Sequence, residues 1–252
     1  GDGFSYVNLL NGEKVTNVGW GTEFDGLPVT CCNLNGPMGL AYIPYVALME
    51  HEQGPVINLY NAAQIRMQTP QGRDLGLKIV TDYPLSEEVE IQVDPSESET
   101  FTVKVRIPAW SRNTQLEANR ESFSGVTPGR YFNIERTWRP GDRIEMNFEM
   151  KCRLIDAPKG SNRAGDHFQA LVYGPIVLAR DENIDPHYNR PVQVVADASE
   201  EVRIRRVDPL LGGTRMEWLV PTTEGDIRMS DYASVNGWQG SHICTWLPRP
   251  VR

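Results

Sequence analysis

Two adjacent cysteines, Cys31 and Cys32, are the residues of this chain best suited to chemistry. They cannot easily bridge to each other, because neighbouring Cα atoms lie ~3.8 Å apart across a trans peptide and an unstrained disulfide prefers ~5.5 Å. Side by side, they can offer two thiolates to one metal ion such as zinc. The alternative is that both are ordinary buried side chains, since free cysteine is among the most buried residue types.

Other reactive residue types are scattered. Glu23 and Asp25 could form a carboxylate pair, although solvated loop acids are the simpler interpretation. Cys152 and Cys244 lie in strand-like segments and are predicted to be core residues. The histidines show no metal-ligand spacing, which favours surface or internally bonded side chains. These histidines are His51, His167, His187 and His242.

Tryptophan could stack on sugar faces, because its ring is large and flat and carries a polar N–H group. Trp110, Trp138 and Trp246 fall at strand ends, so we expect them in a core or an interface. Trp238, between Gly237 and Gln239, is the one that we expect to be exposed. Trp20 and Trp218 complete the set.

The composition is that of a packed globular protein. The 252 residues carry a net charge of −8 and are 40% hydrophobic, which allows one large or two modest domains. An acidic chain without Lys/Arg runs is a poor binder of nucleic acid or anionic membranes, so we expect neither partner. No stretch approaches ~18 uninterrupted apolar residues, so we expect no transmembrane helix. The cysteine spacing assigns no compartment and does not resemble a disulfide framework.

One apolar helix is predicted near the start of the chain. Asn35 is a candidate N-cap, Pro37 suits a first turn, and residues 39–48 are apolar on nearly all sides. Such a helix should be buried against others, and Pro44 predicts a kink or an early end. No other apolar helix is apparent. We therefore expect a piece cut from an α-rich domain, with the helix docking on the following domain or driving self-association.

After residue 54 nearly every segment has the pattern of a β-strand. Period-2 alternation with one polar face indicates antiparallel sheets with a solvated side. Pro140 and Gly141 mark a turn between two such segments. The predicted strands cover residues 56–60, 77–81, 89–93, 101–107, 131–136, 143–148, 168–173, 176–179, 192–195, 202–205, 216–220 and 243–247.

This pattern predicts a mainly β fold with two antiparallel, jelly-roll-like β-sandwich domains behind a short helical segment. The polar stretch 156–162 is the best internal boundary by composition. The expected domains are residues 1–54, then a first sandwich over 55–157, then a second over 158–252. The last strand is a candidate to return to the first sandwich.

An ordered set of motifs gives the chain a resemblance to a known family. The motifs are Cys31-Cys32-x-x-Asn35, Asn58-Leu59-Tyr60, Arg106-Ile107-Pro108-Ala109-Trp110, Glu135-Arg136-Thr137-Trp138-Arg139-Pro140-Gly141-Asp142, Tyr173-Gly174-Pro175-Ile176-Val177 and Trp246-Leu247-Pro248. Together they resemble glycoside hydrolase family 127, whose known members are β-L-arabinofuranosidases. The resemblance implies an (α/α)6 catalytic barrel followed by two β-sandwiches, with residues 1–54 as the last part of that barrel.

The resemblance also implies a mechanism. Cys31 matches the family's nucleophile in a retaining reaction and is a zinc ligand there, and Cys32 matches a second ligand. The third cysteine, the ligating glutamate and the acid/base glutamate of the family have no match here, so we expect them upstream. Two departures stand out: Asn33 and Leu34 where many members have proline after the pair, and Met38 where an arginine is common. The arginine's absence bears on substrate identity.

Three hypotheses follow. The chain could be the C-terminal region of a zinc-dependent hydrolase of plant-type arabinose-containing glycans, inactive and without zinc by itself. It could instead be a non-catalytic carbohydrate-binding module with an aromatic platform. It could also be a structural domain that supports the barrel and forms a homodimer.

Overall fold

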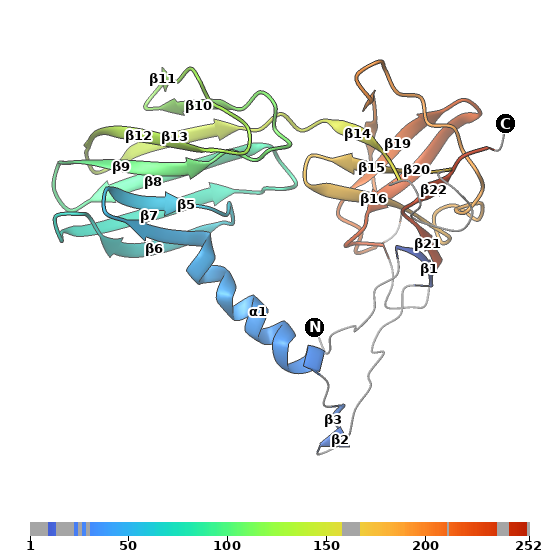
Figure 1. The fold of residues 1–252 in the computed structure, drawn as a ribbon, viewed down its shortest axis with the longest axis horizontal. Helices are drawn as coiled ribbons and strands as arrows, with labels where there is room; N and C mark the ends of the chain where they lie inside the picture. Colours follow the sequence, from blue (N-terminus) through green and yellow to red (C-terminus); the bar gives the residue numbers. More distant parts are fainter. Residues whose placement is uncertain are drawn as a thin grey trace. The chain divides into compact units, whose positions relative to one another are not determined.

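The computed structural model describes residues 10–13, 23–24, 27–28, 31–157, 167–210, 212–235 and 242–250. Within these ranges the chain is mainly β, with one helix, α1 (Cys31–Ala47), ahead of most of the strands (Figure 1). Its contacts divide it into two compact units. One holds residues 40–150, and the other holds residues 1–39 and 151–252. This organisation confirms the predicted fold class.

The unit of residues 40–150 is built from two sheets. The six-stranded sheet runs in the order β11-β10-β13-β8-β7-β6, and the four-stranded sheet in the order β12-β9-β5-β4. The six strands are β6 (Ala63–Gln68), β7 (Asp74–Thr81), β8 (Glu88–Pro95), β10 (Gln115–Ala118), β11 (Glu121–Ser122) and β13 (Asp142–Asn147). The four strands are β4 (Leu48–His51), β5 (Gly54–Ile57), β9 (Glu99–Arg106) and β12 (Tyr131–Trp138).

A single hydrophobic core joins the two sheets into a sandwich. The six-stranded sheet contributes alternate residues such as Leu77 and Ile91, and the four-stranded sheet contributes Val103, Ile134 and Trp138. All five are at most 2% exposed. Because successive side chains of a strand point to opposite faces, the residues between them lie on the outer faces, in contact with solvent. The alternation in the sequence therefore does specify one buried and one solvated face.

Strand pairing in the sandwich is antiparallel with one exception. Strand β5 pairs with β9 in parallel, with Val56 opposite Lys104. The predicted turn at Pro140 joins β12 to β13: the Asp142 amide donates to the Arg139 carbonyl, and Gly141 has a positive φ of 86°. A left-handed backbone at this position explains the glycine.

The other unit forms one branched sheet. Its main path is β17-β14-β15-β16-β20-β19-β18, and β1, β21 and β22 pair beside it. The strands are β1 (Asn11–Glu13), β14 (Cys152–Asp156), β15 (Phe168–Tyr173), β16 (Ile176–Asp181), β17 (Glu201–Val202), β18 (Arg205–Val207), β19 (Glu217–Thr222), β20 (Gly225–Asp231), β21 (His242–Cys244) and β22 (Leu247–Pro248). A separate pair, β2 (Glu23–Phe24) with β3 (Leu27–Pro28), lies before α1. Jelly-roll connectivity stays a prediction.

The pairings differ from the expected domain limits of 54/55 and 157/158. Strand β4 joins the four-stranded sheet, so pairing in the first sandwich begins at Leu48. Strand β14 pairs with β15 and β17, so it lies in the second sheet, although the sequence pattern assigned it to the first sandwich. The final strands β21 and β22 pair with β16 and β15, and do not return to the first sandwich. Of the predicted strand 192–195, only Val194 forms a bridge, to Thr222.

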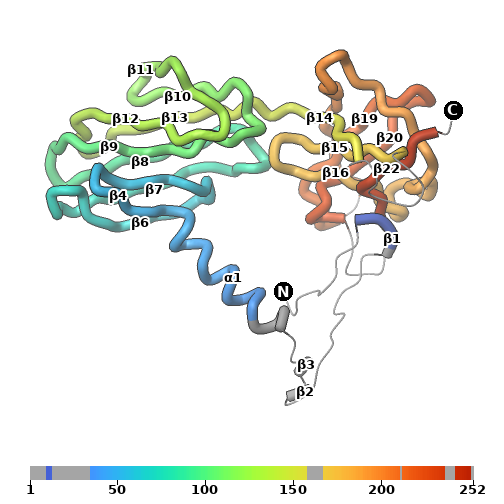
Figure 2. The backbone as a smooth tube through the Cα atoms, in the orientation of Figure 1, coloured from blue at the N-terminus to red at the C-terminus, as the bar shows by residue number. Residues whose placement is uncertain are grey.

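Helix α1 begins earlier than predicted. It starts at Cys31, so Asn35 lies inside the helix and the prediction that it caps the N-terminus is wrong. The helix continues through Pro44 to Ala47 and leads directly into β4 (Figure 2). Among the described residues, no helix has both the length and the apolar character needed to cross a bilayer.

Gly54, at the start of β5, gives a direct test of how closely β5 packs against β9. Gly54 has φ 136°, and a Cβ atom there would lie 2.3 Å from the Thr102 carbonyl oxygen. We expect Gly54→Ala to lower the free energy of unfolding by about 3 kcal/mol, from strained backbone plus the clash. The control is Gly72→Ala, which also has a positive φ, of 79°, but open space around it, with an expected loss of about 1 kcal/mol. Equal losses in urea denaturation would contradict the close approach of β5 and β9.

Candidate functional site

The cysteine pair lies at the N-terminus of α1. Both Cys31 and Cys32 belong to the first turn of the helix, although their side chains are outside the described part of the structure. The first amide groups of a helix have no intrahelical partner, and the helix dipole places partial positive charge there. In proteins generally, a thiol placed against a helix N-terminus has a lowered pKa and favours the thiolate, which is the reactive and metal-binding form.

The part of α1 that follows the cysteines is apolar and is exposed on all sides. Met38, Leu40, Tyr42, Ile43 and Tyr45 are between 41% and 76% exposed. The expectation that this helix docks on the first sandwich is therefore wrong for the described residues. Contiguous apolar patches of this kind usually mark an interaction site.

The other end of α1 is held by Asn58, just after β5. The Asn58 amide donates to the Ala47 carbonyl at 2.8 Å, and its side-chain Nδ2 donates to the Val46 carbonyl at 3.0 Å. The Leu59 amide also donates to the Ala47 carbonyl, at 3.2 Å. The last carbonyls of a helix lack intrahelical donors, so these bonds satisfy the C-terminus of α1 from the sandwich.

Two residues of the four-stranded sheet fix Asn58 in turn. Arg106 Nε donates to the Asn58 carbonyl at 2.6 Å, and the Tyr131 hydroxyl donates to Asn58 Oδ1 at 2.7 Å. The buried Tyr60 hydroxyl donates to the Arg106 carbonyl, and burial raises the pKa of Tyr60. Asn58, Tyr60 and Arg106 belong to motifs recognised in the sequence, but no role could be assigned to them there. The fold shows their role, because it brings all three together at the end of α1.

The remaining cysteines behave as core residues. Cys152 and Cys244 are buried and free. Burial raises the pKa of the Cys152 thiol to about 12 and that of Cys244 to about 11. Both thiols are therefore neutral near pH 7, which confirms the prediction that they fill the core.

The histidines lie apart from one another. His51 Nδ1 is 3.2 Å from Lys104 Nζ, and His242 Nδ1 is 3.1 Å from a carboxylate oxygen of Glu182. The backbone of His187 takes part in a turn with Asp185, and the His167 carbonyl accepts a bond from the Arg249 amide. Within the described ranges no three His, Cys, Asp or Glu side chains form a group suited to a metal ion.

The tryptophans follow the prediction where they are described. Trp138 is fully buried and its Nε1 donates to the Phe101 carbonyl at 3.0 Å, and Trp218 is also buried. Trp110 is half-buried, with its ring nearly parallel to that of Tyr83 at 6.4 Å between centroids. Trp246 is also half-buried. Trp20, Trp238 and Asp25 lie outside the described residues, as does the side chain of Glu23.

A comparison with protein-family models finds one match, over residues 55–150, to the middle domain of the family 127 β-L-arabinofuranosidases. This part of the chain is therefore similar to the middle domain of that family. The match covers the sandwich from β5 to the end of β13, including Asn58, Tyr60 and Arg106. The resemblance drawn from the motifs is thereby confirmed.

Solved structures share the fold over most of the chain. A family 127 β-L-arabinofuranosidase from Geobacillus stearothermophilus T6 is 22% identical with a TM-score of 0.72, over 87% of this chain and 37% of its own. A second family 127 β-arabinofuranosidase is 20% identical with a TM-score of 0.75, over 99% of this chain and 42% of its own. A glycoside hydrolase is 19% identical with a TM-score of 0.76, over 98% of this chain and 44% of its own. The chain thus spans less than half the length of each. Among curated proteins, a sequence search finds no match.

The anchor at Asn58 gives a testable prediction. Asn58→Ala removes the side-chain hydrogen bonds to Val46 and Tyr131. We therefore expect it to lower the free energy of unfolding of the sandwich of residues 40–150 by about 1–3 kcal/mol. Tyr131→Phe removes one bond only and should cost about 0.5–1.5 kcal/mol. Hydrogen exchange should show faster exchange of the Asn58 and Leu59 amides in Asn58→Ala. Unchanged exchange would show that the end of α1 is held in some other way.

Proposed function

We propose that this chain is the β-rich C-terminal region of a longer retaining glycoside hydrolase that acts on β-L-arabinofuranosides, with Cys31 as its nucleophile. One observation carries the proposal. The segment similar to a β-L-arabinofuranosidase middle domain, residues 55–150, follows strand β4 and a helix whose first residues are Cys31 and Cys32. Two of the similar solved structures are arabinofuranosidases.

The chemistry proposed for Cys31 is a displacement at the anomeric carbon. Its thiolate forms a carbon–sulfur bond while the glycosidic carbon–oxygen bond breaks, and the leaving oxygen takes a proton from a carboxylic acid. Water then displaces the sulfur, with the same carboxylate as base, which retains the anomeric configuration. That acid/base residue is expected elsewhere in the longer protein.

The donor set of this chain fits half of a zinc site. Two cysteine thiolates supply two of the four ligands of a tetrahedral zinc ion, and no group of three candidate ligands exists among the described residues. Cys31 and Cys32 would hold the ion from the first turn of α1. Bound zinc would keep their thiols deprotonated. We propose that the other two ligands belong to the longer protein, and we therefore expect this chain alone to be inactive and to bind zinc poorly.

The exposed apolar side of α1 supports the same proposal. Leu40 and Tyr45 are 58% and 76% exposed, and exposing large apolar side chains forfeits about 1.5–3 kcal/mol each. In the longer protein this side would pack against the remaining helices of a catalytic domain. Packing of this side between two copies of the chain, giving a homodimer, is the alternative.

The test uses a longer protein containing this chain and an aryl β-L-arabinofuranoside. We expect hydrolysis by the wild type, loss of at least ~10³-fold in kcat with Cys31→Ser, and loss of zinc with Cys32→Ser. The buried Cys152→Ser is the matched control and should retain activity in protein that folds. This chain alone should show neither hydrolysis nor stoichiometric zinc.

Two results would contradict the proposal. Unchanged activity of Cys31→Ser would exclude it as the nucleophile. Hydrolysis by this chain alone, or zinc retained by it after mild chelation, would mean that the missing groups lie within these 252 residues.

A further inference from the structure

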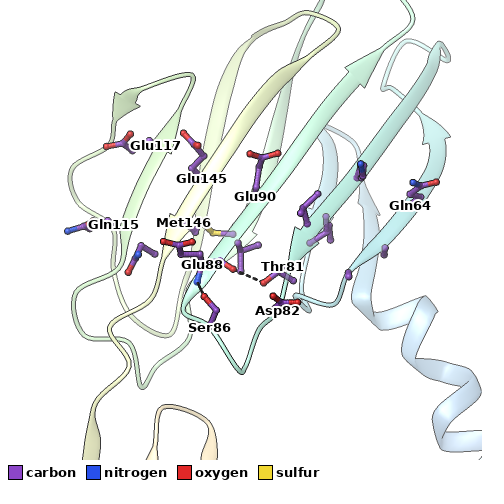
Figure 3. Close-up of a pocket in the computed structure, with 17 residues that line it drawn as sticks. Gln64, Thr81, Asp82, Ser86, Glu88, Glu90, Gln115, Glu117, Glu145 and Met146 are labelled. Atoms are coloured by element: carbon purple, nitrogen blue, oxygen red, sulfur yellow. Dashed lines mark hydrogen bonds between the residues drawn. The ribbon is translucent and has the colours of Figure 1, made fainter. Parts of the chain in front are cut away.

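A broad groove lies on the solvated face of the six-stranded sheet in the sandwich of residues 40–150. It has a volume of about 1030 Å³ and is lined by side chains from β6, β7, β8, β10 and β13. Figure 3 shows the polar side chains that stand along it. The groove is independent of the cysteine pair, because all its lining residues belong to the sandwich.

Strand register arranges six of these side chains in two rows. Glu117, Glu145 and Glu90 are directly opposite one another on β10, β13 and β8, and they form the row seen in Figure 3. Two residues along each strand, Gln115, Asn147 and Glu88 form the second row. Neighbouring strands are ~4.8 Å apart and alternate residues ~6.8 Å apart, so the six polar groups form a regular two-by-three array.

Two of these six side chains already have hydrogen-bond partners within the protein. Arg143 and Gln92 donate to the Glu90 carboxylate at 3.1 and 2.8 Å, and the Ser122 hydroxyl donates to Glu117 at 2.7 Å. The other four side chains have no hydrogen-bond partner among the described residues. They are the amides Gln115 and Asn147 and the carboxylates Glu145 and Glu88.

The free groups complement hydroxyl groups. Each amide presents both donors and an acceptor, and each carboxylate accepts strong bonds from O–H donors. The groove also carries more carboxylates than cations: Asp82 adds a fifth acid, and Lys78 is the one basic residue in its lining. This charge disfavours uronic acids and other anionic sugars.

We propose that this groove binds a neutral carbohydrate chain, separately from any hydrolysis at Cys31. A cationic peptide is the less favoured ligand, because two of the four free groups are neutral amides, which a sugar hydroxyl can match and an ammonium group cannot. No aromatic ring lines the groove. Binding therefore relies on hydrogen bonds without stacking, and we expect a Kd on the order of 1 mM.

The test is calorimetric titration of this chain with a neutral arabinopentaose, a pentagalacturonate and a pentalysine. We expect arabinopentaose to bind, and pentagalacturonate to bind at least tenfold more weakly. The double variant Gln115→Ala/Asn147→Ala should lose at least tenfold in affinity for arabinopentaose. The matched control is Asn133→Ala, an exposed amide on β12 in the opposite sheet, which should bind as the wild type does.

Several outcomes would overturn the proposal: no binding of arabinopentaose, binding that the double variant leaves intact, or preferential and salt-sensitive binding of pentalysine. Because Gln115 is exposed and Asn147 is half-buried, the double variant should fold, which circular dichroism verifies. Cys31→Ser should leave this binding unchanged. A failure of the groove proposal is thus distinguishable from a failure of the catalytic one.

Discussion

The hydrogen bonds of Asn58 connect the end of helix α1 to the sandwich of residues 40–150. A helix whose last carbonyls are unsatisfied frays, and the packing of its sides cannot compensate here because most of α1 is exposed. Asn58 supplies two donors to Val46 and Ala47 and is itself held by Arg106 and Tyr131. The helix that begins at the cysteine pair therefore ends in a fixed place on a rigid sheet.

Side-chain periodicity made much of the sandwich predictable. The strands with clean alternation, such as β8 and β9, carry their apolar residues into one core. Strand β6 was missed although it alternates, because five of its six residues are Ala, Gln, Arg or Met, which favour helix over strand. The opposite error occurred at residues 192–195. Val192 and Val194 are buried, and this segment makes backbone hydrogen bonds to Pro221, Thr223 and Pro248. Only Val194 has the geometry of a bridge, so the apolar run predicted burial and pairing but not a continuous strand.

The candidate site was predictable only in part. Two adjacent cysteines signal metal or thiol chemistry by their type, but Asn58, Tyr60 and Arg106 gained meaning only when the fold brought them to the end of α1. Likewise, Gln115, Asn147 and Glu88 are ordinary polar residues in the sequence, and only strand register aligns them. The apolar pattern of α1 predicted a surface that needs a partner. It could not predict that the first sandwich is not that partner.

The central claim, that Cys31 attacks the sugar, is tested most directly by trapping its covalent adduct. A longer protein containing this chain would be treated with an activated β-L-arabinofuranosyl substrate whose second step is slow, then digested and analysed by mass spectrometry. The proposal predicts one arabinofuranosyl group on the peptide that contains Cys31, and none after Cys31→Ser. An adduct on any other residue, with hydrolysis intact, would contradict it.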